Sequence, residues 1–324
     1  MTRPGGEGQR GPGGRGGPGG RGGPGATSTP PDLSGRTVAV IGLGTMGSGM
    51  ASRLAATGAT LRVFNRSRAA AEAFAASHAA TAAATPAEAV DGADLVLVSV
   101  ADDQAVRDVL LGPAGVHAAR RPAGVVLNTS TVSPATLDAV AAHLPLLAAG
   151  ILGNGEHARE GLLRWYVGGP EPLLRRAEPV LAALGQQVRH LDGLAAGMRL
   201  KIAMNLLMGL EMQAMAEVVA LAESAGLSRR LVLDAIGESG FAAPVMRFKA
   251  RRMATDSYAE PDFRLRLMAK DLALAMAQAA ESGTSLPMTA AATRTHATAV
   301  TVGLGDADCA AVLRVLAPAV EAAR

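Results

Sequence analysis

With 324 residues, 49% of them hydrophobic, the chain is long enough for about two domains with a sizeable buried core. The first 35 residues hold four arginines against one glutamate and one aspartate. They therefore carry two of the three net positive charges, and the nearly neutral remainder argues against a nucleic-acid-binding surface. The single cysteine, Cys309, excludes an internal disulfide framework. Without an apolar run of about 18 residues or a signal peptide, we expect a cytoplasmic chain with no membrane span.

Residues 1–34 form a tail of low complexity, in which Gly13-Gly-Arg-Gly-Gly-Pro18 repeats as Gly19-Gly-Arg-Gly-Gly-Pro24. Such a segment has almost nothing to bury, so we predict that it is disordered. Arg-Gly-Gly units also occur in RNA-binding tails. Because no aromatic residues stand between the two units here, a passive tail is the favoured interpretation.

Between residues 35 and 193, short apolar runs alternate with helical stretches. The predicted strands and helices are Thr37–Ile41, Met46–Thr57, Thr60–Phe64, Arg68–Ala76, Leu95–Val100, Gln104–Leu111, Gly124–Leu127 and Pro134–Ala142. Further strands are predicted at Leu144–Ala149, Leu163–Val167 and Gln187–His190. This alternation predicts an α/β Rossmann domain, a doubly wound parallel sheet covered by helices on both faces.

Residues 194–324 have no strand pattern and are predicted to form an all-helical domain for substrate binding and dimerisation. A long interdomain helix, Leu194–Ala225, is closed by Gly226 and carries a stripe of methionines that suits core or subunit packing. The other predicted helices are Arg229–Gly237, part of Tyr258–Gly283, Met288–Val302, and Asp308–Ala323 behind an Asp306 cap.

Three glycines, Gly42, Gly44 and Gly47, follow the first predicted strand with the spacing G-x-G-x-x-G and open a helix. The first allows a tight turn, the second lets the backbone approach a pyrophosphate, and the third lets the helix pack closely on the sheet. The spacing alone also fits an ordinary glycine turn, but the strand and helix around it favour a dinucleotide site. The predicted cofactor turn comprises Gly42, Leu43, Gly44, Thr45, Met46 and Gly47.

The second strand is followed by Asn65-Arg66-Ser67-Arg68. Enzymes that prefer NAD place an acidic residue here for the ribose 2′-hydroxyl. An amide, two guanidiniums and a hydroxyl suit a 2′-phosphate instead, so NADP is predicted over NAD. Ser67 can equally be the N-cap of the next helix, and both roles can hold at once.

The ordered set of motifs resembles the β-hydroxyacid dehydrogenases, the family of 3-hydroxyisobutyrate dehydrogenase and the glyoxylate and succinic semialdehyde reductases, to which imine reductases are related. The matching segments are Gly42-Leu-Gly-Thr-Met-Gly47, Asn65-Arg-Ser67, Asn128-Thr-Ser-Thr131, Lys201-Ile-Ala-Met-Asn205, and Phe263 followed by Lys270-Asp271. The resemblance spans about residues 35 to 315. It implies a homodimer that shares the long helix.

By this resemblance Lys201 is the catalytic acid/base and Asn205 positions the substrate. The two residues are four apart in a helix and share a face. A lysine that works near neutral pH needs a pKa about three units below its ordinary 10.4, which requires burial of the amine. Without the resemblance, a lysine on an apolar helix would more often be a surface residue whose ammonium reaches water.

Further cofactor contacts are implied at Val100-Ala101, although the family usually has Leu-Pro there, and at Thr131 beside the nicotinamide. Lys270 matches a lysine of the helical domain that closes over the cofactor. Ser130, next to Thr131, is a candidate substrate contact. None of the six histidines shows metal-ligand spacing, so no metal site is predicted.

The predicted substrate loop departs from the family pattern. Where the family commonly has Asp-Ala-Pro-Val-Ser-Gly-Gly, this chain has Ala148-Ala-Gly-Ile-Leu-Gly-Asn154. By the resemblance, the candidate substrate contacts are Leu152, Gly153 and Asn154. Leu152 stands where the family has serine, so a hydroxyl is lost and an apolar group is gained. This change predicts either that the substrate carboxylate is bound differently or that the substrate is larger and less charged. Glu156, His157 and Arg159 would lie in a following loop, for which a solvated role is favoured.

The sequence thus predicts an NADPH-dependent oxidoreductase that moves hydride between nicotinamide and the hydroxyl or carbonyl carbon of a small substrate, resembling a β-hydroxy acid or semialdehyde. One alternative is an imine reductase, although that branch usually carries Asp or Tyr in place of Lys201. The other is a non-catalytic NADP-binding scaffold whose tail binds nucleic acid.

Overall fold

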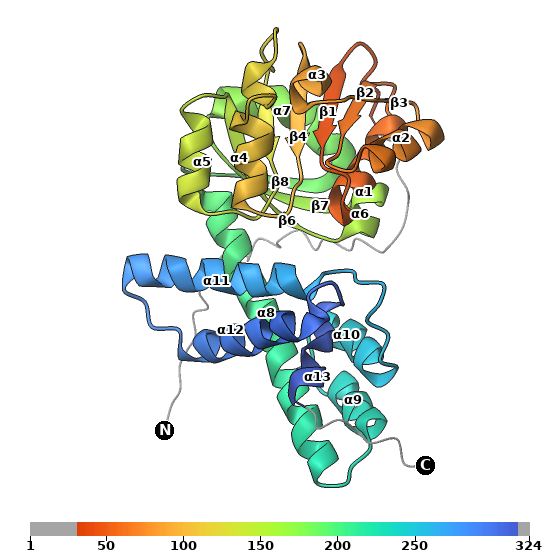
Figure 1. The fold of residues 1–324 in the computed structure, drawn as a ribbon, viewed down its shortest axis with the longest axis vertical. Helices are drawn as coiled ribbons and strands as arrows, with labels where there is room; N and C mark the ends of the chain where they lie inside the picture. Colours follow the sequence, from red (N-terminus) through yellow and green to blue (C-terminus); the bar gives the residue numbers. More distant parts are fainter. Residues whose placement is uncertain (1–30, 317–324) are drawn as a thin grey trace, which may run out of the picture.

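The computed structural model describes residues 31–316. The predicted tail, apart from residues 31–34, and the last eight residues lie outside this range. Two domains are stacked along the long axis of the molecule, and the helix α8 runs from one into the other (Figure 1).

The first domain is built on one sheet of eight strands in the order β3-β2-β1-β4-β5-β6-β7-β8. The strands are β1 (Thr37–Ile41), β2 (Thr60–Phe64), β3 (Ala80–Ala82), β4 (Leu95–Val98), β5 (Val126–Asn128), β6 (Leu146–Leu152), β7 (Leu163–Gly168) and β8 (Gly185–Leu191). Neighbouring strands are parallel except β6 and β7, which run antiparallel. The Rossmann prediction is confirmed, but the sheet is mixed because the short connection between β6 and β7 cannot make a parallel crossover.

Helices cover both faces of this sheet because successive side chains of a strand point to opposite sides. In β1, Val38 and Val40 belong to one hydrophobic core, and Ala39 and Ile41 to the other. The first core is closed by α1 (Thr45–Ala55), α2 (Arg68–Ser77), α6 (Gly155–Glu160) and α7 (Glu171–Leu184). The second is closed by α3 (Pro86–Val90), α4 (Asp103–Leu111), α5 (Pro134–Ala141) and the 3₁₀ turn η1 (Val116–Ala118).

The second domain is helical, as predicted, and wraps around α8 (Figure 1). Its elements are α8 (Ala196–Ser224), α9 (Arg229–Glu238), α10 (Pro244–Ala254), α11 (Leu265–Ser282), α12 (Pro287–Ala299), the π-helical segment η2 (Val300–Leu304), η3 (Cys309–Val312) and α13 (Leu313–Leu316). The last segment is capped by Asp308, whose side chain accepts from the Ala310 N–H, and not by Asp306. Asp306 instead pairs with Arg264 and Arg266.

Helix α8 is 29 residues long and mostly apolar. Among residues 31–316 it is the one helix that could cross a membrane by length and composition, although 44% of its most apolar stretch is buried within the structure. Met212, Met215 and Val219 lie in the core of the second domain, and Met198 and Ile202 lie in a core of the first. The apolar composition of α8 is therefore accounted for in part by its passage through two cores.

Candidate active site

The glycine-rich turn after β1 leaves one position open to a ligand. A Cβ on Gly42, whose φ is +95°, would lie 2.2 Å from the Ser99 carbonyl oxygen, and one on Gly47 would lie 2.0 Å from the Gly42 carbonyl oxygen. A Cβ on Gly44 would meet no atom within 4 Å. Gly44 is also the N-cap of α1 and offers no side chain to the first N–H groups of that helix. The turn therefore fits a dinucleotide diphosphate at a helix N-terminus.

The segment after β2 supports this turn and offers a cationic side chain beside it. The Asn65 Oδ1 accepts from the Leu43 N–H at 3.1 Å, so the amide braces the cofactor turn. Ser67 caps α2, as one reading of the sequence expected. Arg66 is exposed, whereas Arg68 is paired with Glu72 along α2.

The loops after β4 and β5 are joined at the same end of the sheet. The Val100 N–H donates to the Ser130 Oγ at 2.9 Å, and Ala101 beside it is exposed. The Thr131 carbonyl oxygen accepts from the Lys270 Nζ at 2.5 Å, a bond between the first domain and α11. The structure thus joins Val100 to Ser130, a predicted cofactor contact to a predicted substrate contact, and joins Thr131 to Lys270, two predicted cofactor contacts.

Asp271 extends this contact to the predicted catalytic helix. Its carboxylate, which is 1% exposed, accepts from Lys270 Nζ at 2.7 Å and from Asn205 Nδ2 at 2.5 Å. Sequence reasoning missed Asp271 as a site residue, since it appeared only as part of the Lys270-Asp271 motif. A buried carboxylate needs such partners, and here both belong to the predicted site.

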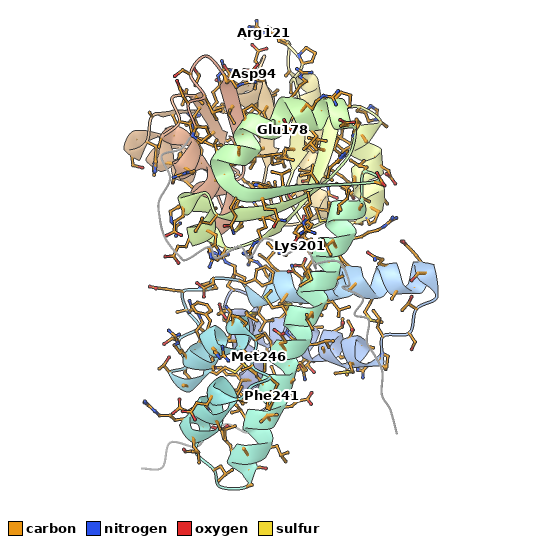
Figure 2. The ribbon with its side chains drawn as sticks, turned by 180° about the vertical axis from the view of Figure 1, so that it is seen from behind. Asp94, Arg121, Glu178, Lys201, Phe241 and Met246 are labelled. Atoms are coloured by element: carbon orange, nitrogen blue, oxygen red, sulfur yellow. The ribbon has the colours of Figure 1, made fainter. Side chains whose placement is uncertain are left out.

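Lys201 lies one helical turn before Asn205, at the junction of the two domains (Figure 2). The residue is half-buried. Burial lowers the pKa of its amine, Asp271 raises it by a smaller amount, and Lys270 lowers it further. The net direction is the one that a lysine acting near neutral pH requires.

A glycine in β6 places Lys201 against the sheet. A Cβ on Gly150 would lie 2.2 Å from the Gly197 carbonyl oxygen and 3.1 Å from the Lys201 Cβ. The first turn of α8 therefore packs directly on the β6 backbone. Leu152 stands two residues after Gly150 and so points to the same face of the sheet.

The predicted substrate loop is part of strand β6 as far as Leu152, and its last residue, Asn154, caps a helix. The Asn154 Oδ1 accepts from the His157 N–H at 2.9 Å, and the Asn154 N–H donates to His157 Nδ1 at 3.2 Å. These two bonds cap α6. The prediction of a loop that carries Glu156, His157 and Arg159 is therefore wrong, because these residues lie in a helix. Asn154 is engaged in this cap, whereas Leu152 and Gly153 remain candidate substrate contacts.

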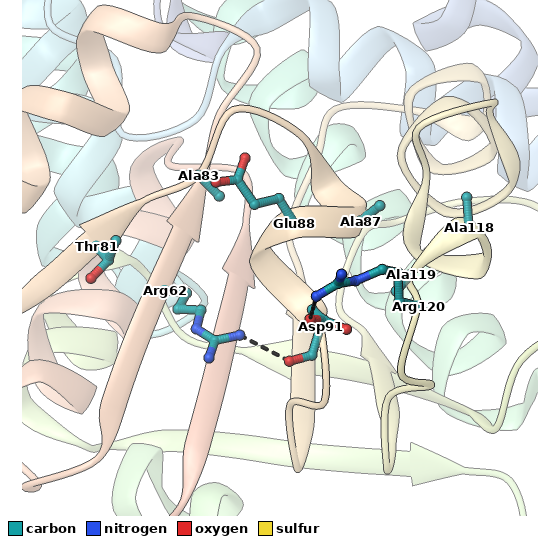
Figure 3. A pocket seen from close by; sticks show the side chains of 9 residues that line it. All are labelled: Arg62, Thr81, Ala83, Ala87, Glu88, Asp91, Ala118, Ala119 and Arg120. Atoms are coloured by element: carbon teal, nitrogen blue, oxygen red, sulfur yellow. Dashed lines mark hydrogen bonds and ion pairs between the residues drawn. The ribbon is translucent and has the colours of Figure 1, made fainter.

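A cavity of about 470 Å³ lies elsewhere, beside β2, β3 and α3 (Figure 3). Arg62 reaches from β2 into it and donates to the Asp91 carbonyl oxygen at 3.0 Å. None of the residues predicted for cofactor or substrate lines this cavity. The site between the domains is accordingly defined by its contacts and not by this hollow.

A Rossmann turn open to a diphosphate, together with a half-buried lysine beside a buried asparagine–aspartate pair, suits an NAD(P)-dependent oxidoreductase. Residues 37–193 match the family model of the NAD-binding domain of 6-phosphogluconate dehydrogenase. Residues 195–316 match the model described as NAD-binding of NADP-dependent 3-hydroxyisobutyrate dehydrogenase.

Two dehydrogenases are similar to the chain over nearly their whole length. It is 31% identical to 2-(hydroxymethyl)glutarate dehydrogenase of Eubacterium barkeri, over 86% of this chain and 94% of that protein. It is 30% identical to the solved 3-hydroxyisobutyrate dehydrogenase of Mycobacterium tuberculosis, with a TM-score of 0.73, over 87% of this chain and 99% of that one. The chain belongs to the 3-hydroxyisobutyrate dehydrogenase-like β-hydroxyacid dehydrogenases, NAD(P)-dependent oxidoreductases that act on CH–OH groups.

The chain is also 30% identical to the cytokine-like nuclear factor N-PAC of Xenopus tropicalis, over 86% of its own length. It spans about half of that relative, 53%.

Proposed function

We propose that this protein is an NADPH-dependent reductase or dehydrogenase of a small β-hydroxy acid or semialdehyde-like substrate, with Lys201 as its general acid/base. The observation that carries the proposal is the chain of contacts Thr131–Lys270–Asp271–Asn205, which ends one helical turn from a lysine whose pKa is lowered by burial. The two dehydrogenase relatives, which are named for hydroxy-acid substrates, support the substrate class.

In this proposal the cofactor supplies the hydride when bound, and the chain supplies the proton and the geometry. Protonated Lys201 donates to the oxygen of the substrate carbonyl during reduction, and the neutral amine accepts the hydroxyl proton during oxidation. Asn205, held by Asp271, orients that oxygen. Lys270 keeps the β5 loop and α11 in contact beside Thr131.

The decisive experiment measures NADPH oxidation with glyoxylate, succinic semialdehyde, other short aldehydes, uncharged ketones and a cyclic imine. Lys201→Ala should nearly abolish turnover while NADPH still binds, as measured by the fluorescence of the bound cofactor. Arg199→Ala, an exposed residue on the same helix, is the matched control and should turn over normally. Undiminished turnover in Lys201→Ala would refute the catalytic role.

The choice of NADP over NAD rests on Arg66. It is exposed beside the braced cofactor turn and can face a 2′-phosphate. The family model that matches the second domain is described as NADP-dependent. Arg66→Ala should weaken NADPH binding much more than NADH binding, and equal losses for the two cofactors would contradict the assignment.

The same substrate panel tests the imine reductase alternative. The imine reductase of a Pseudomonas species has a similar structure, but at 22% identity this likeness shows the fold alone. Turnover of the cyclic imine without turnover of any aldehyde would favour that alternative. NADPH binding without any turnover would favour a cofactor-binding scaffold.

We further propose a homodimer formed through α8. One face of this helix exposes residues at alternating spacings of three and four, the pattern of a two-helix seam. They are Met204, Leu207, Ala214, Val218 and Leu221, with the half-buried Glu211 in register. Light scattering should give twice the chain mass of 32.7 kDa, and Val218→Asp should shift the protein towards the single mass. A wild-type protein with the single mass would contradict the dimer.

A further inference from the structure

Two cofactor-side loops are cross-tied at two separate places. The first tie is the bond from the Val100 N–H to the Ser130 Oγ. The second lies a few residues further along both loops, between Asp103 at the start of α4 and Ser133 before α5. Thr131 stands between the two ties, and its carbonyl oxygen is the acceptor for Lys270.

Asp103 gathers three hydrogen bonds on one carboxylate oxygen. Its Oδ1 accepts from the Ser133 N–H at 3.0 Å, the Ser133 Oγ at 2.5 Å and the Thr136 Oγ1 at 2.7 Å. Arg107, one turn along α4, donates to the same Thr136 hydroxyl at 2.9 Å. The N-terminus of α5 is thus fastened to α4 through two side chains of α4, and Asp103 accepts three of the four hydrogen bonds.

The charge of Asp103 is well supported in this position. Burial alone would raise the pKa of its carboxyl, but the bonds from Ser133 and Thr136 outweigh burial, and Lys270 adds to them, so the pKa is held below its ordinary range. Asp103 is therefore ionised at neutral pH. Hydrogen bonds to an ionised acceptor are the stronger kind.

We propose that Asp103 is a positioning residue for the nicotinamide end of the cofactor, which fixes Thr131 by anchoring the loop on its far side. The proposal rests on the function proposed above, in which Thr131 lies beside the nicotinamide. Asn128 braces the same loop from the near side, where its side chain bonds both the N–H and the carbonyl oxygen of Ser130. With both ends held, the loop meets the cofactor without a cost for ordering it at the moment of binding.

The test is a fluorescence titration of the full-length protein with NADPH, which needs no substrate. Asp103→Ala removes all three bonds and should weaken NADPH binding about tenfold or more, with a matching rise in KM for NADPH and a smaller fall in kcat. Asp103→Asn keeps an acceptor oxygen and should stay within about threefold of the wild type. Asp108→Asn, an exposed residue of the same helix that accepts from Gln104, should bind as the wild type does.

A merely structural role predicts a different pattern, in which the melting temperature falls while the folded fraction binds NADPH normally. That result, or wild-type affinity in Asp103→Ala, would overturn the proposal. Should Asp103→Ala fail to fold, Ser133→Ala decides the matter: it removes one of the three bonds and should weaken NADPH binding by a factor between those of the Asn and Ala variants, whereas unchanged affinity overturns the proposal. Failure of the proposed function is distinguishable, because then the wild type itself would not bind NADPH or Lys201→Ala would still turn over.

Discussion

Replacement of Gly150 by alanine should disable the enzyme without removing any reacting group. The added Cβ would lie 2.2 Å from the Gly197 carbonyl oxygen, whereas carbon and oxygen approach no closer than about 3.3 Å even in favourable contacts. The first turn of α8 must therefore retreat from β6 by about 1 Å. Lys201 lies on the next turn, with its Cβ 3.1 Å from the new methyl group, and moves with it.

A misplacement of about 1 Å typically lowers the rate of a positioned reaction by about 100-fold. Overpacking of this kind also lowers the free energy of unfolding by about 1–3 kcal/mol. NADPH binding should persist, because the close neighbours of a Cβ on Gly150 include no residue of the cofactor turn from Gly42 to Gly47.

The assay is kcat for the best substrate of the panel, with NADPH fluorescence and a thermal melt on the same samples. Gly237→Ala is the control, since a Cβ there meets no atom within 4 Å and alanine suits the helix α9. A Gly150→Ala enzyme with kcat within about threefold of the wild type would refute the reasoning, as would a loss of NADPH binding equal to the loss of kcat.

Three further predictions concern charged and titratable groups. Asp271→Asn removes the one contribution that raises the pKa of Lys201. In a profile of kcat against pH, the rate of reduction should therefore begin to fall at a lower pH than in the wild type. Lys249→Met leaves the fully buried Asp308 without the ammonium that it contacts at 2.6 Å, and urea denaturation should show a loss of about 3–5 kcal/mol. Burial lowers the folded-state pKa of His296 below 6.5, so its contribution to stability is complete above the unfolded-state pKa and is lost as the pH falls below it. Denaturation at about pH 7.5 and about pH 5.5 should therefore differ less in His296→Gln than in the wild type.

The elements that the sequence predicts well are those whose pattern is local and long. Thr37–Ile41 and Thr60–Phe64 are both confirmed at their predicted bounds because an apolar run ends at a turn signal. The three-residue strand β3 is too short to show alternation. Helix α7 contains Pro179, a residue that argues against a helix interior, and it was not predicted.

The candidate site divides in the same way. The glycine turn and the Lys201–Asn205 spacing are local patterns, so the sequence contains them. The importance of Asp271 depends on partners 66 residues away at Asn205 and one residue away at Lys270. The cap that occupies Asn154 depends on a six-residue helix, which has less than two full turns in which a helical period can be recognised.

The division of the site along α8 has a mechanical consequence. Lys201 is seated on the sheet through Gly150, whereas Asn205 is tied to α11 through Asp271. Lys201 and Asn205, the two residues that would hold a substrate oxygen, are therefore held by different domains. Because they share one helix, their separation stays the same whatever angle the domains adopt. The hydrogen bond between Thr131 and Lys270, in contrast, joins two elements that do not belong to one helix. The distance between Lys270 Nζ and the Thr131 carbonyl oxygen would therefore change with the angle between the two domains, whereas the distance between Lys201 and Asn205 would not.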